Sequence, residues 1–146
     1  MSIEWRKEYE LGINIIDYQH QRLITIANEI DAITQRRETG NDQLSPETEK
    51  LIETSFLNLI NYYNYHFTIE EMAMEKCNYP EFSDHQMAHD KFVEKIHECY
   101  KKYHKQHFRA LHETVEFLNA WLIDHIMVED RKYVTELSVV FSSKSK

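Results

Sequence analysis

A stripe of apolar residues, spaced alternately by four and three positions, runs along residues 52–73. This spacing puts the stripe on one face of a long helix that packs in a bundle. Two positions of the stripe are polar, His66 and Glu70, where leucine would give a better core. An unpaired buried charge is costly, so this pair needs a partner. Side chains four residues apart point the same way. The pair therefore either binds a metal ion or forms a simple histidine–glutamate hydrogen bond.

The composition favours a single all-α domain. The chain has 146 residues but only two glycines and two prolines, and few segments alternate as a strand does. No apolar run approaches the length of a membrane span, and the net charge of −8 argues against nucleic acid or an anionic membrane as partner. Cys77 and Cys99 form no CxxC motif, so we expect two reduced thiols in a cytoplasmic protein.

Four amphipathic helices with short connections predict an antiparallel up-down-up-down four-helix bundle. The first covers residues 17–37. The second follows the N-cap Ser45, with Pro46 in its first position, and ends near residue 76. The third, capped by Ser83 or Asp84, ends near residue 105, and the fourth covers residues 110–137. Residues 1–12 are expected to form an extended arm anchored by Trp5. The predicted bundle domain is thus residues 1–137, and residues 138–146 form a frayed polar tail.

Histidines interrupt the apolar stripes of the other three helices as well, at His20, His85, His89 and His125. A single histidine on an apolar face is more often a core residue than a ligand. Two histidines four residues apart, however, can bring two imidazoles from one helix to one metal ion. In an antiparallel bundle, the start of an odd-numbered helix lies level with the end of an even-numbered one. All of these polar residues therefore fall at one end of the core, which predicts a metal site there.

The predicted donor set points to two metal ions. Five histidines and a carboxylate are too many for one tetrahedral zinc ion, and the lack of thiolates favours iron or manganese. A second bridging carboxylate is expected near His125, and there are two candidates. Glu129 lies four residues on, on the same helical face. Asp130 lies five residues on, about 140° round an ideal helix, and needs a locally widened turn of the kind found at functional sites.

The order and spacing of these residues resemble the hemerythrin family from Trp5 to about Tyr133. That pattern is a lone histidine on the first helix, then HxxxE, HxxxH and HxxxxD on the next three. Here the positions are His20, His66–Glu70, His85–His89 and His125–Asp130. The single chain is similar to the stand-alone bacterial form.

The resemblance implies two non-haem iron ions with an oxo or hydroxo bridge. It assigns three histidines (His85, His89, His125) to one iron, two (His20, His66) to the other, and Glu70 and Asp130 to both. It thereby selects Asp130 over Glu129.

The resemblance also implies reversible binding of dioxygen, for storage, delivery or sensing. The oxygen would be held as hydroperoxide at the two-histidine iron, which keeps an open position. A dry apolar shell would protect it, and the candidates adjacent to the ligands are Leu23, Phe67, Trp121 and Ile126. These four would pack in the core in either case. Because the residues next to the open position are apolar, we expect reversible oxygen binding and not primarily enzymatic turnover.

Three alternatives to oxygen binding remain from the sequence alone. The same open iron could reduce peroxide or nitric oxide, the site could sequester iron, or the bundle could be a metal-free interaction module. A ferritin-like enzyme would need two inward-facing Glu-x-x-His pairs, and the chain has a single one, Glu94 and His97. The remaining histidines lie off the stripes and are expected to be solvated or at helix ends: His97, His104, His107 and His112.

Overall fold

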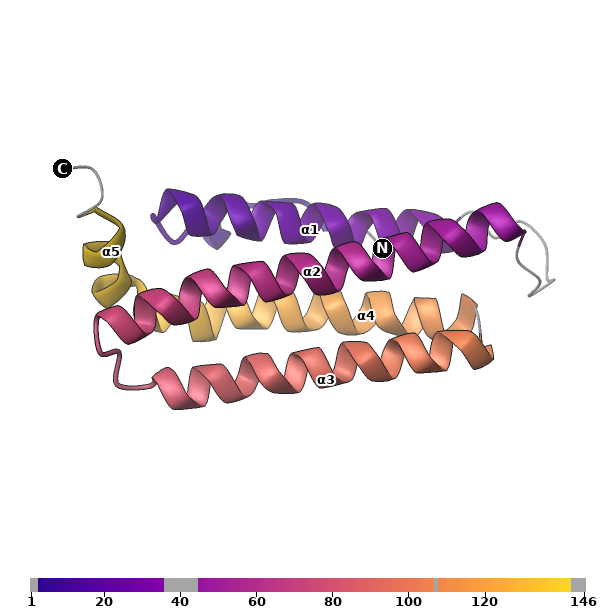
Figure 1. The fold of residues 1–146 in the computed structure, drawn as a ribbon. Helices are drawn as coiled ribbons and strands as arrows, with labels where there is room; N and C mark the ends of the chain where they lie inside the picture. Colours follow the sequence, from indigo (N-terminus) through magenta and orange to yellow (C-terminus); the bar gives the residue numbers. More distant parts are fainter. Residues whose placement is uncertain (1–2, 36–44, 107, 143–146) are drawn as a thin grey trace.

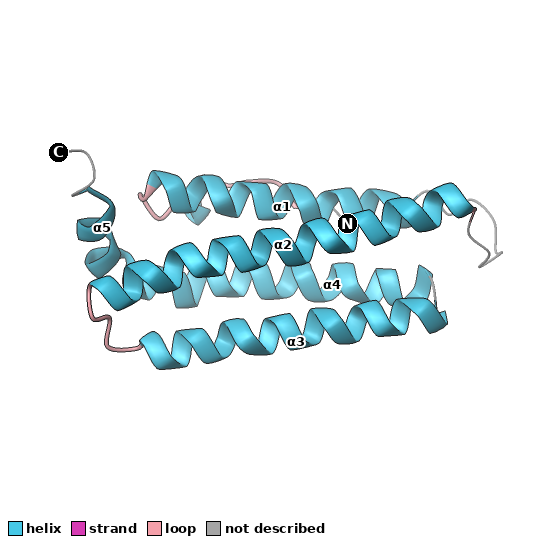
Figure 2. Ribbon diagram, in the orientation of Figure 1, coloured by secondary structure: helices cyan, strands magenta, loops and turns pink. Residues whose placement is uncertain are grey.

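Four long helices form an antiparallel bundle, shaped as a rod (Figure 1). The structure, a computed structural model, describes residues 3–35, 45–106 and 108–142. The helices are α1 (Asn14–Gln35), α2 (Pro46–Lys76), α3 (Phe82–Gln106) and α4 (Phe108–Asp124). α1 and α3 each pack against both α2 and α4. Figure 2 shows helices joined by loops, and the described residues contain no strand. The predicted all-α four-helix bundle is confirmed.

The start of α2 follows the sequence prediction, and the start of α3 does not. The Ser45 side chain accepts a hydrogen bond from the Thr48 backbone N–H at 3.2 Å, and Pro46 opens the helix. α3 begins at Phe82, so the predicted capping residues Ser83 and Asp84 lie inside the helix. The helical hydrogen bond from the His85 N–H to the Glu81 carbonyl shows that the helix begins earlier than the choice of a Ser or Asp cap suggested.

The N-terminal arm is held by more than one aromatic side chain. Trp5 is partly buried and packs edge-on against Tyr9 with ring centroids 5.7 Å apart. Tyr9 and Leu11 are more fully buried than Trp5. A short 3-10 turn at Lys7–Tyr9 interrupts the arm, which the sequence predicted as extended throughout. The turn places Tyr9 against the main core, so the arm covers the flank of the bundle.

The junction between arm and α1 depends on one buried carboxylate. Asp17 accepts hydrogen bonds from the backbone N–H of Leu11 at 2.8 Å and of Gly12 at 3.1 Å. Gly12 has φ of +85°, a conformation that glycine adopts without strain. These bonds orient the chain into α1, which begins at Asn14, three residues earlier than predicted. The predicted end of this helix at residue 37 lies outside the described residues.

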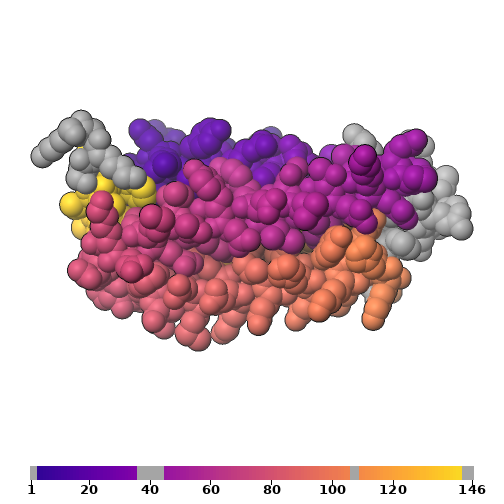
Figure 3. Space-filling view, in the orientation of Figure 1, coloured from indigo at the N-terminus to yellow at the C-terminus, as the bar shows by residue number. Residues whose placement is uncertain are grey.

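The fourth helix is not continuous to residue 137 as predicted. α4 ends at Asp124 and is followed by η2, a π-helical turn (His125–Glu129), and η3, a 3-10 turn (Asp130–Tyr133). A further helix, α5 (Val134–Ser142), then crosses the end of the bundle and packs against α2 (Figure 1). The space-filling view shows α5, in yellow, at that end of the rod (Figure 3).

The predicted frayed tail at residues 138–146 is therefore wrong for residues 138–142, while residues 143–146 lie outside the described part. Leu137 and Val140 of α5 are buried in a second, smaller hydrophobic cluster. The other buried members of this cluster come from the arm, α1, the end of α2 and the turns: Leu11, Ile13, Ile16, Ala73, Met74, Tyr79 and Tyr133. Burial of these apolar side chains offsets the entropy lost when the segment becomes ordered.

Three further observations bear on the sequence predictions. None of the helices in the described residues is both long and apolar enough to cross a membrane. Cys77 and Cys99 are both free thiols. The histidines expected to lie off the apolar stripes, His97, His104 and His112, are exposed. The fourth, His107, lies outside the described residues.

Replacing Asp17 with alanine should destabilise the metal-free protein by about 1–3 kcal/mol, because two backbone N–H groups lose their acceptor. Urea unfolding followed by circular dichroism measures the change. Asp90 is exposed on α3, so Asp90→Ala is the matched control and should stay within about 0.5 kcal/mol of the parent. Equal stability of the two variants would mean that Asp17 does not anchor the arm.

Candidate metal centre

The structure brings all seven predicted site residues together at the α5 end of the bundle. Each of the four segments that form the bundle contributes at least one of them. α1 supplies one, α2 two and α3 two, and the η2 and η3 turns supply one each: His20, His66, Glu70, His85, His89, His125 and Asp130. Every one of these side chains is buried, with at most 4% of the residue exposed. The seven side chains therefore lie at the same end of the core, as the antiparallel order of the helices predicted.

The π-helical turn decides which acidic residue after His125 enters the site. In η2 the Asp130 backbone N–H bonds to the His125 carbonyl, five residues back, which widens the turn. The Asp130 Oδ1 atom consequently lies 2.9 Å from His125 Nε2. Glu129 instead has a side chain that is 38% exposed and pairs with Lys132 at 3.7 Å. The structure thus places Asp130, and not Glu129, in the cluster.

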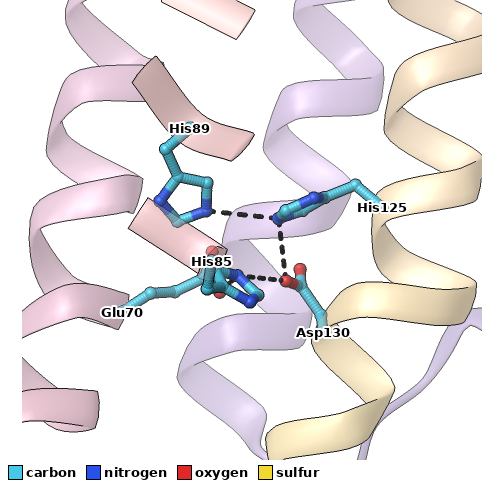
Figure 4. Close-up of side chains that lie close together, drawn as sticks. All are labelled: Glu70, His85, His89, His125 and Asp130. Carbon is cyan, nitrogen blue, oxygen red and sulfur yellow. Dashed lines mark hydrogen bonds and ion pairs between the residues drawn. The ribbon is translucent and has the colours of Figure 1, made fainter. Parts of the chain in front are cut away.

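Five of the residues form one group of potential ligands: Glu70, His85, His89, His125 and Asp130. Their donor atoms all lie within 4.8 Å of one another. His89 Nε2 is 3.2 Å from His125 Nε2, and His85 Nε2 is 3.0 Å from Asp130 Oδ1. Figure 4 shows these rings and the Asp130 carboxylate turned toward a shared centre. Such convergence of nitrogen and oxygen donors is the arrangement that a metal ion requires.

A second group, of four residues, shares both carboxylates with the first: His20, His66, Glu70 and Asp130. His20 Nε2 lies 2.9 Å from Asp130 Oδ2, and His66 Nε2 contacts Glu70 Oε1. On the other side of each carboxylate, His85 Nε2 lies 3.0 Å from Asp130 Oδ1 and 3.6 Å from Glu70 Oε2. Each carboxylate therefore turns one oxygen to each group, as a bridge between two ions would.

The two carboxylates stay ionised because histidines surround them. Burial and the charge of Asp130 raise the pKa of Glu70, but the adjacent His66 and His85 rings outweigh both and hold it well below its usual value. Burial likewise raises the pKa of Asp130, and His125, His20 and His85 lower it well below its usual value. Burial lowers the pKa of His85, yet the two carboxylates raise it to about 10.

The outer ring nitrogens of two histidines fix which nitrogen carries the hydrogen. His89 Nδ1 lies 2.8 Å from the Glu71 carboxylate, which only accepts, so Nδ1 is the donor. Burial lowers the pKa of His89, so the ring is neutral and its Nε2 presents a lone pair to the site. His66 Nδ1 donates in the same way to Gln19 Oε1 at 2.6 Å. The other ring nitrogen, Nε2, faces the Glu70 carboxylate.

Lone pairs that face one another need a cation between them. Within the described residues, both oxygens of Glu70 and of Asp130 are buried without a partner of hydrogen-bond geometry, although imidazole nitrogens lie close by. Two buried carboxylates without enough positive charge would cost several kcal/mol. The donor set and these unsatisfied atoms therefore fit metal ions better than a metal-free hydrogen-bonded core.

Sequence reasoning missed three side chains of this site: Gln19, Glu71 and Tyr133. Gln19 follows Ile16 by three residues and precedes Leu23 by four, so its helical position was a usable signal. Glu71 gave no signal, because its role depends on the distance to the neighbouring helix. Tyr133 is fully buried beside the carboxylates. Burial and the charges of Asp130 and Glu70 raise the pKa of its hydroxyl well above the usual value.

Comparison with known proteins agrees with this geometry. Residues 11–137 match the family described as the hemerythrin HHE cation binding domain. The chain belongs to the hemerythrin family. It is 28% identical to a bacteriohemerythrin of Clostridium acetobutylicum, over 89% of this chain and 97% of that one. It is 27% identical to hemerythrin subunit alpha of Lingula reevii, over 91% and 93% of the two chains.

A solved structure supports the same assignment. The crystal structure of a wild-type hemerythrin superposes on this chain with a TM-score of 0.72 at 28% identity. The match covers 93% of this chain and 98% of the other. The hemerythrin likeness therefore spans the bundle and includes every element that contributes to the metal centre.

Asp130→Ala should reduce bound iron by about half or more, because it removes a carboxylate shared by both groups. Glu129→Ala removes an exposed side chain, so this variant should bind as much iron as the parent protein does. Metal analysis after anaerobic iron(II) loading and gel filtration gives the comparison, and circular dichroism verifies the helices of both variants. The opposite ranking would show that Glu129 is the ligand.

Proposed function

We propose that this hemerythrin-family protein binds dioxygen reversibly at two iron ions held by the seven buried side chains. The observation that carries the proposal is the sharing of Glu70 and Asp130 by the two ligand groups. Relatives named bacteriohemerythrin and hemerythrin support it. Nitrogen and oxygen donors without thiolate favour iron over softer metals.

The division of ligands suggests where oxygen would bind. One ion would be held by His85, His89 and His125. The other would be held by His20 and His66. The second group offers one protein donor fewer, so it is the one we expect to leave a position open. When bound, the iron pair would supply the two electrons that dioxygen takes up.

The protein's own contribution is to hold the rings and exclude water. Phe67 stacks on His89 with ring centroids 3.7 Å apart and planes 7° apart. Trp121 stacks on His125 at 4.2 Å and 13°. Leu23 and Ile126 are buried in the same core cluster. A dry wall of this kind restricts ring rotation and limits the entry of water and reductants. That these four side chains face the open position remains a prediction.

One observation favours the alternative, a di-iron enzyme that reduces peroxide or nitric oxide. The Tyr133 hydroxyl is buried at the carboxylates, and its raised pKa keeps it protonated. A protonated phenol beside the centre could donate a hydrogen bond that stabilises charge on a bound substrate. Tyr133→Phe distinguishes the two functions, because it should leave oxygen binding intact but slow peroxide turnover.

The experiment is an absorption spectrum of iron(II)-loaded protein prepared without oxygen, then aired, then purged with nitrogen. A visible band that appears on airing and disappears on purging, with the iron still reduced, is the expected result. A stable oxidised spectrum after airing would instead favour the peroxide- or nitric-oxide-reducing enzyme. Variable iron loading without any oxygen-dependent band would favour iron sequestration.

Phe67→Leu should accelerate irreversible oxidation of the aired protein several-fold, because the side chain stays apolar but no longer stacks on His89. The decay of the visible band over time measures the rate. Phe56 lies on the same helix and packs against Tyr100 and Tyr103, away from the ligands. Phe56→Leu is therefore the control, and equal rates for the two variants would mean that the wall does not protect the site.

A further inference from the structure

The two ligand groups differ in what holds the outer nitrogen of a histidine ring. In the three-histidine group, His89 Nδ1 donates to a carboxylate, Glu71 Oε2, at 2.8 Å. In the two-histidine group, His66 Nδ1 donates to a neutral amide, Gln19 Oε1, at 2.6 Å. Both bonds join different helices and both anchor rings that are buried. These two rings are thus held by one charged and one uncharged acceptor.

Glu71 is held in this position from two sides. It follows Glu70 on α2, so its side chain leaves the helix about 100° away from the ligand. Its second oxygen, Oε1, accepts a hydrogen bond from Gln86 Nε2 on α3 at 3.0 Å. The side chain is 22% exposed, and contact with water lowers the cost of keeping the charge. The carboxylate is therefore fixed, charged and close to the surface.

An anionic acceptor affects a metal ligand in two ways. It fixes the tautomer and ring orientation, and it increases the electron donation of the opposite nitrogen. A charged acceptor makes a stronger hydrogen bond than a neutral amide does. The His89 ring should therefore be the stronger donor of the two, and negative charge near an ion favours its more oxidised state.

We propose that Glu71 is a positioning residue that orients His89 and, by its charge, makes the ion at the three-histidine group the easier of the two to oxidise. This inference rests on the proposed function, since it needs two iron ions at the site. Gln19 accepts the corresponding hydrogen bond from His66 in the two-histidine group without adding charge. The pair of acceptors makes the two ions electronically unequal before any oxygen arrives.

The test compares charge-removing and charge-adding variants that keep the acceptor. Glu71→Gln retains a side-chain oxygen for His89 but removes the charge. Gln19→Glu adds a charge at the two-histidine group. Glu75 lies one turn further along α2 and is exposed, so Glu75→Gln is the control with the same change in net charge. The measurements are the reduction potentials by anaerobic redox titration and the affinity for iron(II) by competition with a chelator.

Glu71→Gln should raise the lower of the two reduction potentials, because the ion that is easier to oxidise loses a stabilising negative charge, and should weaken iron(II) binding about 10- to 100-fold in one binding step. Gln19→Glu should lower the higher of the two reduction potentials. Glu75→Gln should change neither the potentials nor the affinity for iron(II). A purely structural role for Glu71 would change the melting temperature of the metal-free protein but not the potentials.

The outcomes separate the two proposals. Parental potentials and affinities in Glu71→Gln, in a protein that binds two irons and oxygen, would overturn the role of Glu71 and leave the proposed function intact. Failure of the parent protein to bind iron would overturn both.

Discussion

Two fully buried carboxylates, Glu70 and Asp130, are the constraint on which the rest of the structure depends. Neither can remain in the core without positive charge on both sides, because burial of an unpaired carboxylate costs several kcal/mol. In the part of the chain that the structure describes, the groups within ion-pair distance of them are histidines, contributed by α1, α2, α3 and the η2 turn. The helices must therefore meet at one level, and this requirement fixes their register in the bundle.

The C-terminal segment carries the local adaptation that this arrangement needs. A regular helix would turn Asp130 away from His125, and the π-helical turn η2 returns it to the site. The 3-10 turn that follows redirects the chain, and α5 then covers the metal end of the core with Leu137 and Val140. The departure from regular helix and the covering of the site are thus parts of one arrangement. Apolar burial by α5 offsets the less favourable hydrogen bonds of the turns.

Most of the fold and of the ligand cluster could be predicted from helical periodicity and antiparallel geometry. The stripes placed His20, His66 and His89 on inward faces, and antiparallel order put them at one level. Periodicity failed where the helix itself changes: it favoured Glu129, and it continued α4 through residue 137. The family resemblance corrected the first error, but not the second. Glu71 and Gln86 could not be found, because their contact depends on the distance between α2 and α3.

The most direct test of the account is anomalous X-ray diffraction at the iron edge from crystals of the iron-loaded protein. Two iron positions are expected, with Glu70 and Asp130 in contact with both. Three histidines should surround one ion and two should surround the other. A single iron position, or iron held away from either carboxylate, would contradict the central claim that these two side chains bridge a pair of ions.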